Sequence, residues 1–262
     1  MRRELFSAFA VLTLAAAASA APITTTYAED FDSMGTSGTT PPTSWKHIVF
    51  NMTTSNGTWT NSTGIPANGT NSVASIPVTA AGTTLTATNN PTSNNNNGYN
   101  AARTTSATSD RVLATAPTNV TGTGIQLTLT NANTLPIDTL TVRFDIVRFT
   151  APSSANELPG YWLFISTNGT SWTHIGPAPT LTEVPNSVGV SNLTRSFGTV
   201  NVPLVNPGAD FYLRWVDDNA AQSSPDQIVG LNNVLITATV VPEPAGLSLL
   251  GCTALVGLRR RR

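Results

Sequence analysis

Two short groups of acidic residues are the part of this sequence that could coordinate a metal ion. The first group surrounds residue 30, and the second follows the alternating run YLRWV. Carboxylate oxygens are hard ligands of the kind that Ca²⁺ prefers. If the first and last strands of the fold are neighbours, the two groups approach each other. The candidate calcium ligands are therefore Glu29, Asp30, Asp32, Asp217 and Asp218, and the alternative is a solvated acidic surface.

Side chains that commonly carry catalysis are scarce. Between residues 21 and 240 the chain has two histidines, His47 and His174, and one lysine, Lys46. No H-E-x-x-H, G-x-S-x-G or P-loop pattern occurs. We interpret the two histidines as surface or half-buried imidazoles on strands. The sequence therefore predicts a protein that is not an enzyme.

Polysaccharide cleavage is the alternative function. A glycoside hydrolase needs two carboxylates across a sugar cleft. The run Asp217-Asp218-Asn219 is more typical of a turn after a strand, because Asp and Asn bond to nearby backbone donors. A lyase usually needs a basic, Tyr or His site for an acidic sugar, and Lys and His are rare here. The other carboxylates that a hydrolase could use are Glu29, Asp30, Asp32, Glu157 and Asp226.

Five tryptophans could either fill a core or form a platform on which a sugar stacks. Trp162 and Trp215 lie in alternating runs, which predicts core positions. Trp59 lies in the polar run NGTWTN, which favours exposure. Trp59 is therefore the candidate ligand-contacting residue.

The elements that must position these residues are β-strands. Low charge, abundant Thr, Asn, Ser and Gly, and short apolar bursts favour strands over helices. The clearest strand covers 140–149, where Val142, Phe144 and Ile146 share one face. Asn168-Gly169 predicts a hairpin between 160–166 and 171–175. Further strands are expected at 45–52, 73–78, 83–88, 111–115, 125–130, 210–216 and 230–241.

About nine or ten short strands with polar turns predict an all-β fold, a single β-sandwich over residues 21–240. The stretches 55–71 and 89–110 have almost nothing to bury, so we expect long exposed loops there. Residues 21–240 contain no cysteine. A hydrophobic core must therefore supply the stability without disulfides.

A set of short motifs runs through this region: FDSMG at 31–35, PPTSW at 41–45, DRVL at 110–113, YWLFISTNGTSW at 161–172, YLRWVD at 212–217 and VGLNNVLI at 229–236. Together they resemble the motifs of secreted bacterial jelly-roll proteins. The resemblance implies a jelly-roll-like sandwich across most of residues 29–241. Leu231-Asn232-Asn233 stands where the family would have an acidic pair, which removes carboxylates from a place where such domains sometimes bind calcium.

The C-terminus has a three-part pattern of a different kind. Val241-Pro242-Glu243-Pro244 precedes an apolar stretch at 245–258, and Arg259, Arg260, Arg261 and Arg262 end the chain. The prolines allow a helix to begin only after residue 244. That helix is shorter than the roughly 20 residues of an unaided membrane span, but the arginine stems can extend it. The arginines are expected to stay on the cytoplasmic side.

This pattern resembles the PEP-CTERM sorting signal of Gram-negative bacteria. The resemblance implies that residues 241–262 anchor the chain in the inner membrane until an exosortase cuts it. The N-terminus carries a matching export signal at 1–20. Arg2 and Arg3 precede an apolar run, and Ala18-Ser19-Ala20 is an A-x-A site that predicts cleavage before Ala21.

The charge of the remaining chain excludes one class of partner. Residues 21–240 carry seven basic and twelve acidic side chains, so this region is mildly acidic. Nucleic-acid binding requires a basic stripe, which is absent from the sequence. We therefore expect a protein of the cell surface or extracellular matrix that binds or builds exopolysaccharide, as the sorting family implies. A passive structural or adhesive protein ranks next, followed by a secreted hydrolase or lyase.

Overall fold

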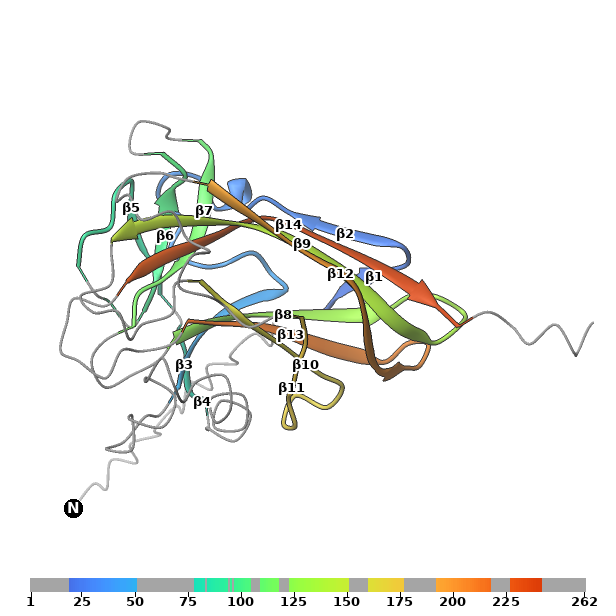
Figure 1. The fold of residues 1–262 in the computed structure, drawn as a ribbon. Coiled ribbons are helices and arrows are strands. Elements are labelled where there is room, and N and C mark those ends of the chain that lie inside the picture. Colours follow the sequence, from blue (N-terminus) through green and yellow to red (C-terminus); the bar gives the residue numbers. More distant parts are fainter. Residues whose placement is uncertain are drawn as a thin grey trace, which may run out of the picture.

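The chain folds as a two-layer β-sandwich (Figure 1). The computed structural model describes residues 19–50, 78–82, 84–93, 95, 97–104, 109–117, 123–150, 160–176, 192–217 and 227–241. These ranges form fourteen strands and one short 3₁₀ turn, η1 (Asp32–Met34). They contain no helix long and apolar enough to cross a membrane. The predicted all-β, jelly-roll-like sandwich is therefore confirmed.

The first sheet, the lower layer in Figure 1, has seven strands in the order β11-β10-β13-β8-β3-β4, with β1 parallel to the end of β8. Its other pairs are antiparallel. The strands are β1 (Ala21–Ile23), β3 (Trp45–Phe50), β4 (Val78–Gly82), β8 (Thr123–Asn131), β10 (Trp162–Ser166), β11 (Thr173–His174) and β13 (Asp210–Asp217).

The second sheet, the upper layer, also has seven strands, in the order β12-β9-β14-β7-β6-β5, and β2 pairs with β14. β14 therefore lies at the centre of this sheet, with β9 on one side and both β2 and β7 on the other. The strands are β2 (Thr26–Glu29), β5 (Thr86–Thr88), β6 (Tyr99–Ala102), β7 (Arg111–Thr115), β9 (Ile137–Thr150), β12 (Asn192–Val205) and β14 (Ile228–Val240).

The main core fills the space between the two sheets, and strand alternation explains which residues enter it. Val142, Phe144 and Ile146 point inward as predicted, whereas Arg143 between them is exposed. Trp215 lies at the centre, 5.4 Å from the Trp45 ring and 6.0 Å from that of Phe144. Such tilted and edge-to-face aromatic pairs add to the free energy of apolar burial.

The structure corrects several details of the expected strands. The segment 89–110 is not one long loop, because its residues 99–102 form the buried strand β6. Asn100 there is fully buried and donates hydrogen bonds to the Gly35 and Gly38 carbonyls. β12 had no sequence signal, since Gly198 and Pro203 interrupt its pattern. Edge strands tolerate such residues. The 55–71 stretch and most of 73–78 lie outside the described residues.

The hairpin predicted at Asn168-Gly169 exists, but its turn is wider than two residues. Phe164 pairs with His174, and only Gly169 of the dipeptide has a positive φ, 72°. The Asn168 side chain accepts hydrogen bonds from the backbone of Thr170 and Ser171. The loop is therefore held by side-chain bonds, and it carries Trp172 at the end where the chain re-enters the sheet.

Candidate ligand-binding surfaces

The two predicted groups of calcium ligands lie at opposite ends of β7. Asp32 accepts a 2.7 Å hydrogen bond from the Arg111 amide, and Asp217 accepts one of 2.6 Å from the Thr115 hydroxyl. Arg111 and Thr115 are four residues apart, about 13 Å along a strand. No group of three potential metal-ligating side chains forms within the described ranges, and Asp218 lies outside them. The structure does not bring the two groups together.

Asp217 belongs to an internal polar cluster and not to a turn. It is the last residue of β13, it is fully buried, and it also accepts a 3.1 Å bond from Gln227. The Tyr161 hydroxyl donates to the Val229 carbonyl beside it. Burial raises the pKa of Tyr161 well above its usual value, and the nearby Asp217 carboxylate raises it further. This cluster therefore connects the two sheets and leaves Asp217 inaccessible.

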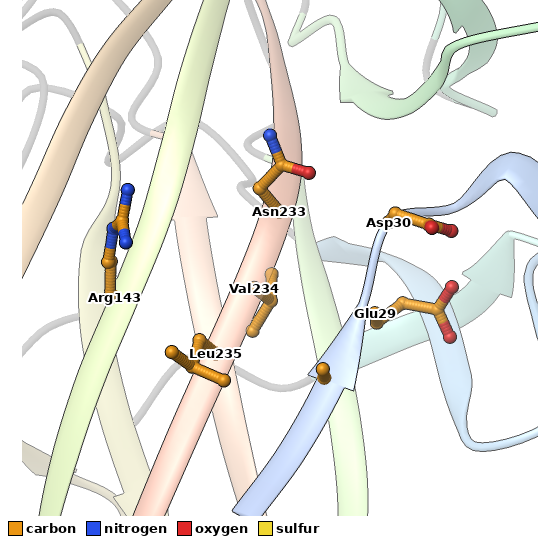
Figure 2. Close-up of a pocket in the computed structure, with 7 residues that line it drawn as sticks. Glu29, Asp30, Arg143, Asn233, Val234 and Leu235 are labelled. Atoms are coloured by element: carbon orange, nitrogen blue, oxygen red, sulfur yellow. The ribbon is translucent and has the colours of Figure 1, made fainter.

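Glu29 and Asp30 border a groove on the outer face of the second sheet (Figure 2), which we call the β2–β14 groove. Its volume is about 460 Å³. Leu235 pairs with Ala28 on one side and with Arg143 on the other, so the small Ala28 side chain leaves space beside them. The groove is lined by Ala28, Glu29, Asp30, Arg143, Asn233, Val234 and Leu235.

The charges of this groove are separated. Figure 2 shows Glu29 and Asp30 pointing to the side of β2 away from Arg143. Glu29 accepts a 2.8 Å bond from the Phe31 amide, and Asp30 accepts one of 3.0 Å from the Asp32 amide. Burial raises the pKa of Glu29, and the nearby Asp30 carboxylate raises it further. The two carboxylates therefore bond to their own segment of backbone on the far side of β2, and the Arg143 guanidinium is the charged group on the opposite side of the groove.

A second candidate surface lies on the outer face of the first sheet. Trp172 is half-buried, and its ring centroid lies 3.7 Å from Cζ of Arg214. The half-buried Tyr212 ring meets it edge-on at 6.4 Å. Arg214 Nε donates a 2.7 Å bond to Gln126 Oε1. We call Trp172, Tyr212, Arg214 and Gln126 the Trp172 surface.

The Trp172 surface combines a fixed aromatic ring with polar groups. The guanidinium covers one face of the indole, which restricts the rotation of Trp172 before any ligand binds. The half-buried indole offers apolar area to the C–H face of a sugar. Arg214 is itself buried at 8% exposure, so its part is to hold the ring, and the half-buried Tyr212 lies beside it. Trp172, Tyr212 and Arg214 lie in the sequence motifs and Gln126 in an expected strand, but no pattern distinguished Trp172 from a core residue. Its position after an Asn-Gly turn was the one available signal.

The histidines occupy different environments. His47 is not at the surface; it is fully buried, and burial lowers its pKa to about 4. His174 is half-buried as predicted, with Trp162 and Phe164 rings 5.3 and 5.4 Å away, and burial lowers its pKa. Trp162 is buried, but on the outer side of its sheet, because its neighbour Leu163 faces the core.

Other predicted residues lie at or beyond the limits of the described ranges. Ala20 immediately precedes β1, which begins at Ala21. The Val241 amide donates a 2.9 Å bond to the Pro136 carbonyl. The predicted apolar helix at 245–258 lies outside the described ranges. So do the remaining predicted residues: Ala18, Trp59, Glu157, Asp226, Pro242, Glu243, Pro244, Arg259, Arg260, Arg261 and Arg262.

No protein-family model and no curated protein matches this chain. Among solved structures it is similar to TmCBM61 in complex with β-1,4-galactotriose, at 10% identity over 50% of this chain and 72% of that one, with a TM-score of 0.30. It is also similar to a CBM4 structure, at 11% identity over 49% of this chain and 83% of that one, with a TM-score of 0.29. A third similar structure is the K3 cleaved adhesin domain of Lys-gingipain from Porphyromonas gingivalis w83. The identity is 14% over 50% of this chain and 76% of that one, with a TM-score of 0.26. Likeness at this level carries no argument about function.

Proposed function

We propose that this protein is an exported, non-enzymatic β-sandwich that associates with exopolysaccharide at the cell surface or in the extracellular matrix. The Trp172 surface is the observation that carries the binding part of the proposal. The sequence at the two ends of the chain supports the location. Calcium remains a candidate cofactor through Glu29 and Asp30, which accept backbone hydrogen bonds at one end of the β2–β14 groove.

The proposed route begins with an export signal removed before Ala21 and ends with a PEP-CTERM tag. Residues 245–258 would hold the chain in the inner membrane of a Gram-negative bacterium, with the four terminal arginines on the cytoplasmic side. Val241-Pro242-Glu243-Pro244 would then lie where a membrane-bound exosortase reaches it. Mass spectrometry of the protein recovered from the cell envelope tests this route. A chain that still ends at Arg262 would contradict it.

The chemistry of the Trp172 surface supports a sugar ligand. A pyranose ring has C–H faces that pack on an aromatic ring and hydroxyls that both donate and accept hydrogen bonds. Trp172 supplies the aromatic contact, and the half-buried Tyr212 lies beside it in the same patch. Because Arg214 and Gln126 already hold the ring in place, binding loses little side-chain entropy.

The test is binding of the full-length chain to immobilised polygalacturonate, alginate, β-1,3-glucan and β-1,4-galactan, with and without millimolar calcium. We expect saturable binding to at least one polymer, weakened tenfold or more by Trp172→Ala. Leu204→Ala is the matched control, because Leu204 is an exposed apolar residue on β12, 55% accessible, in the other sheet. Polymer shortening would instead identify a hydrolase or lyase. Binding to none of the four would remove the proposed function.

A further inference from the structure

The β2–β14 groove and the Trp172 surface lie on opposite outer faces of the sandwich. Figure 1 shows β2, β9 and β14 in one layer and β10, β11 and β13 in the other. Arg143 and Leu235 lie on the outside of the first of these layers, and Trp172 and Arg214 on the outside of the second. Packed sheets are about 10 Å apart, so the whole thickness of the molecule separates the two surfaces.

Arg143 places its guanidinium at the groove, and the carboxylate that follows it on β9, that of Asp145, already bonds to other residues. Arg143 is exposed, and within the described ranges it forms no ion pair. Asp145 follows it by two residues on the same face of β9. The Asp145 carboxylate accepts bonds from Asn233 at 2.7 Å and from Arg103 at 3.2 Å. The guanidinium of Arg143 therefore faces the groove as a donor to a ligand oxygen.

An apolar side chain lies in the middle of the groove. Leu235 is 37% exposed, which is unusual in this protein, where nearly all large described apolar side chains are buried. It lies between Arg143 and Ala28 in register, and the carboxylates of Glu29 and Asp30 follow Ala28 along β2. Apolar area beside a guanidinium donor matches a polyhydroxylated ring, which has C–H faces and hydroxyls.

The shape of the groove is fixed by a β-bulge. The register of β14 against β9 shifts between Asn232 and Leu235, and Asn233 there has a φ of 46°. This left-handed conformation is uncommon outside glycine. The Asn233 side chain holds it in place by its bond to Asp145. Bulges often re-aim side chains at functional sites, and a preformed groove loses little entropy on binding.

We propose that the β2–β14 groove is a second polysaccharide-binding site, so that one molecule bridges two polysaccharide chains. The proposal rests on the proposed function, since it takes the Trp172 surface as the first site. A single sugar segment cannot reach both outer faces, because the two sheets and their side chains lie between them. A molecule with both sites occupied therefore cross-links the matrix, where a molecule with one site only coats it.

A capture experiment separates one site from two. Each of the four polysaccharides named above is coated on a surface, the full-length chain is bound to it, and the same polysaccharide carrying a fluorescent label is then added. The wild-type protein should retain the label. At protein concentrations that load the coat equally, Arg143→Ala and Trp172→Ala should each retain at least tenfold less label. Leu204→Ala should behave as wild type, and Leu235→Ser should reproduce Arg143→Ala if the latter fails to fold.

The outcomes distinguish failure of this inference from failure of the proposed function. Wild-type protein that binds the coat but retains no label has one site only, which overturns the bridging inference and leaves the proposed function standing. Equal label retention by Arg143→Ala and wild type would place the second site elsewhere, or in a second copy of the chain, and would overturn the role of the groove. If the wild-type protein binds none of the four coats, both the bridging inference and the proposed function are overturned.

Discussion

Thr115 on β7 and Asp217 on β13 are joined across the two sheets by a 2.6 Å hydrogen bond, and neither side chain is accessible to solvent. A carboxylate in this position needs its bonds, because an unsatisfied buried charge is costly. Thr115 also lies 3.0 Å from the Tyr161 hydroxyl. The sandwich is therefore connected at this end by polar bonds inside an otherwise apolar space.

Replacement of Thr115 by Val should lower the free energy of unfolding by about 2 kcal/mol, since it removes a hydrogen bond to a buried charged group. Urea denaturation measures the change. Thr130→Val is the matched control, because Thr130 makes the same type of bond to Asp210 at a solvent-exposed position. Its effect should stay within about 0.5 kcal/mol. Equal effects at both positions would contradict the importance of burial.

Acid should destabilise the protein through His47. Its pKa falls from 6.5 in the unfolded chain to about 4 in the fold, because burial disfavours the charged imidazole. The unfolded state therefore binds more protons between these values. The stability is fully present above pH 6.5 and is lost as the pH falls toward 4, by about 3 kcal/mol at most.

Comparison with His47→Leu isolates this contribution from that of the carboxylates. The variant lacks the titrating group, so its urea midpoint should fall less than that of the wild-type protein between pH 6.5 and 4. Parallel curves for the two proteins over this range would show that His47 takes up a proton in the folded protein as readily as in the unfolded chain, and would contradict this prediction.

Glycine is required at position 98 both by the backbone and by the His47 ring. Gly98 has a φ of 73°, and an added Cβ would lie 2.5 Å from the His47 ring and 2.7 Å from the Ala114 carbonyl oxygen. Gly98→Ala should therefore cost more than Gly208→Ala. Gly208 has the same φ, 74°, but nothing lies within 4 Å of its added Cβ.

Thermal denaturation of the two glycine variants makes this comparison direct. We expect about 1 kcal/mol for Gly208→Ala, the cost of the left-handed backbone alone. We expect a further 2 kcal/mol or so for Gly98→Ala, from the close contacts. Similar melting midpoints would mean that His47 moves aside without loss of packing.

Arg214→Lys should weaken polysaccharide binding about threefold to tenfold without unfolding the protein. The planar guanidinium stacks on Trp172 and bonds to Gln126 at once, whereas an ammonium group cannot do both. Titration against the polymer that the wild-type protein binds gives the affinity, and the near-ultraviolet circular dichroism of Trp172 reports its loosened ring. Unchanged affinity with a changed spectrum would show that the ring need not be held in place.

The strongly alternating strands were predictable from the sequence, and the pairing of weak ones was not. Val142, Phe144 and Ile146 indicated β9 because each buries a large side chain at period two. β6 has only Tyr99 and two alanines for such a signal, and it exists because Arg111 bonds to Asn100 from the neighbouring strand. A local sequence pattern cannot show the hydrogen bonds between Arg111 and Asn100, because these bonds form only once the two strands are paired.

The candidate sites show the same limit. Glu29 and Asp30 were predicted to approach Asp217, but they border a groove that Arg143 also lines, and Asp217 lies in the buried cluster at the other end of β7. Which side chains share a face of β2, β14 and β9 depends on register, and a bulge at Asn233 changes that register. Trp172 could not be separated from the buried tryptophans, because its exposure depends on the width of the turn that precedes it.

The central position of β14 determines the order in which the fold can form. This strand is the last of the described chain, residues 228–240, yet β2, β7 and β9 all pair with it. A chain made from its N-terminus cannot close the second sheet until residue 240 has emerged. Pairing over such distances is slow, because loop closure precedes any gain from contact. The second sheet therefore closes only in a late step, after its strands β2, β7 and β9 have waited for the final strand.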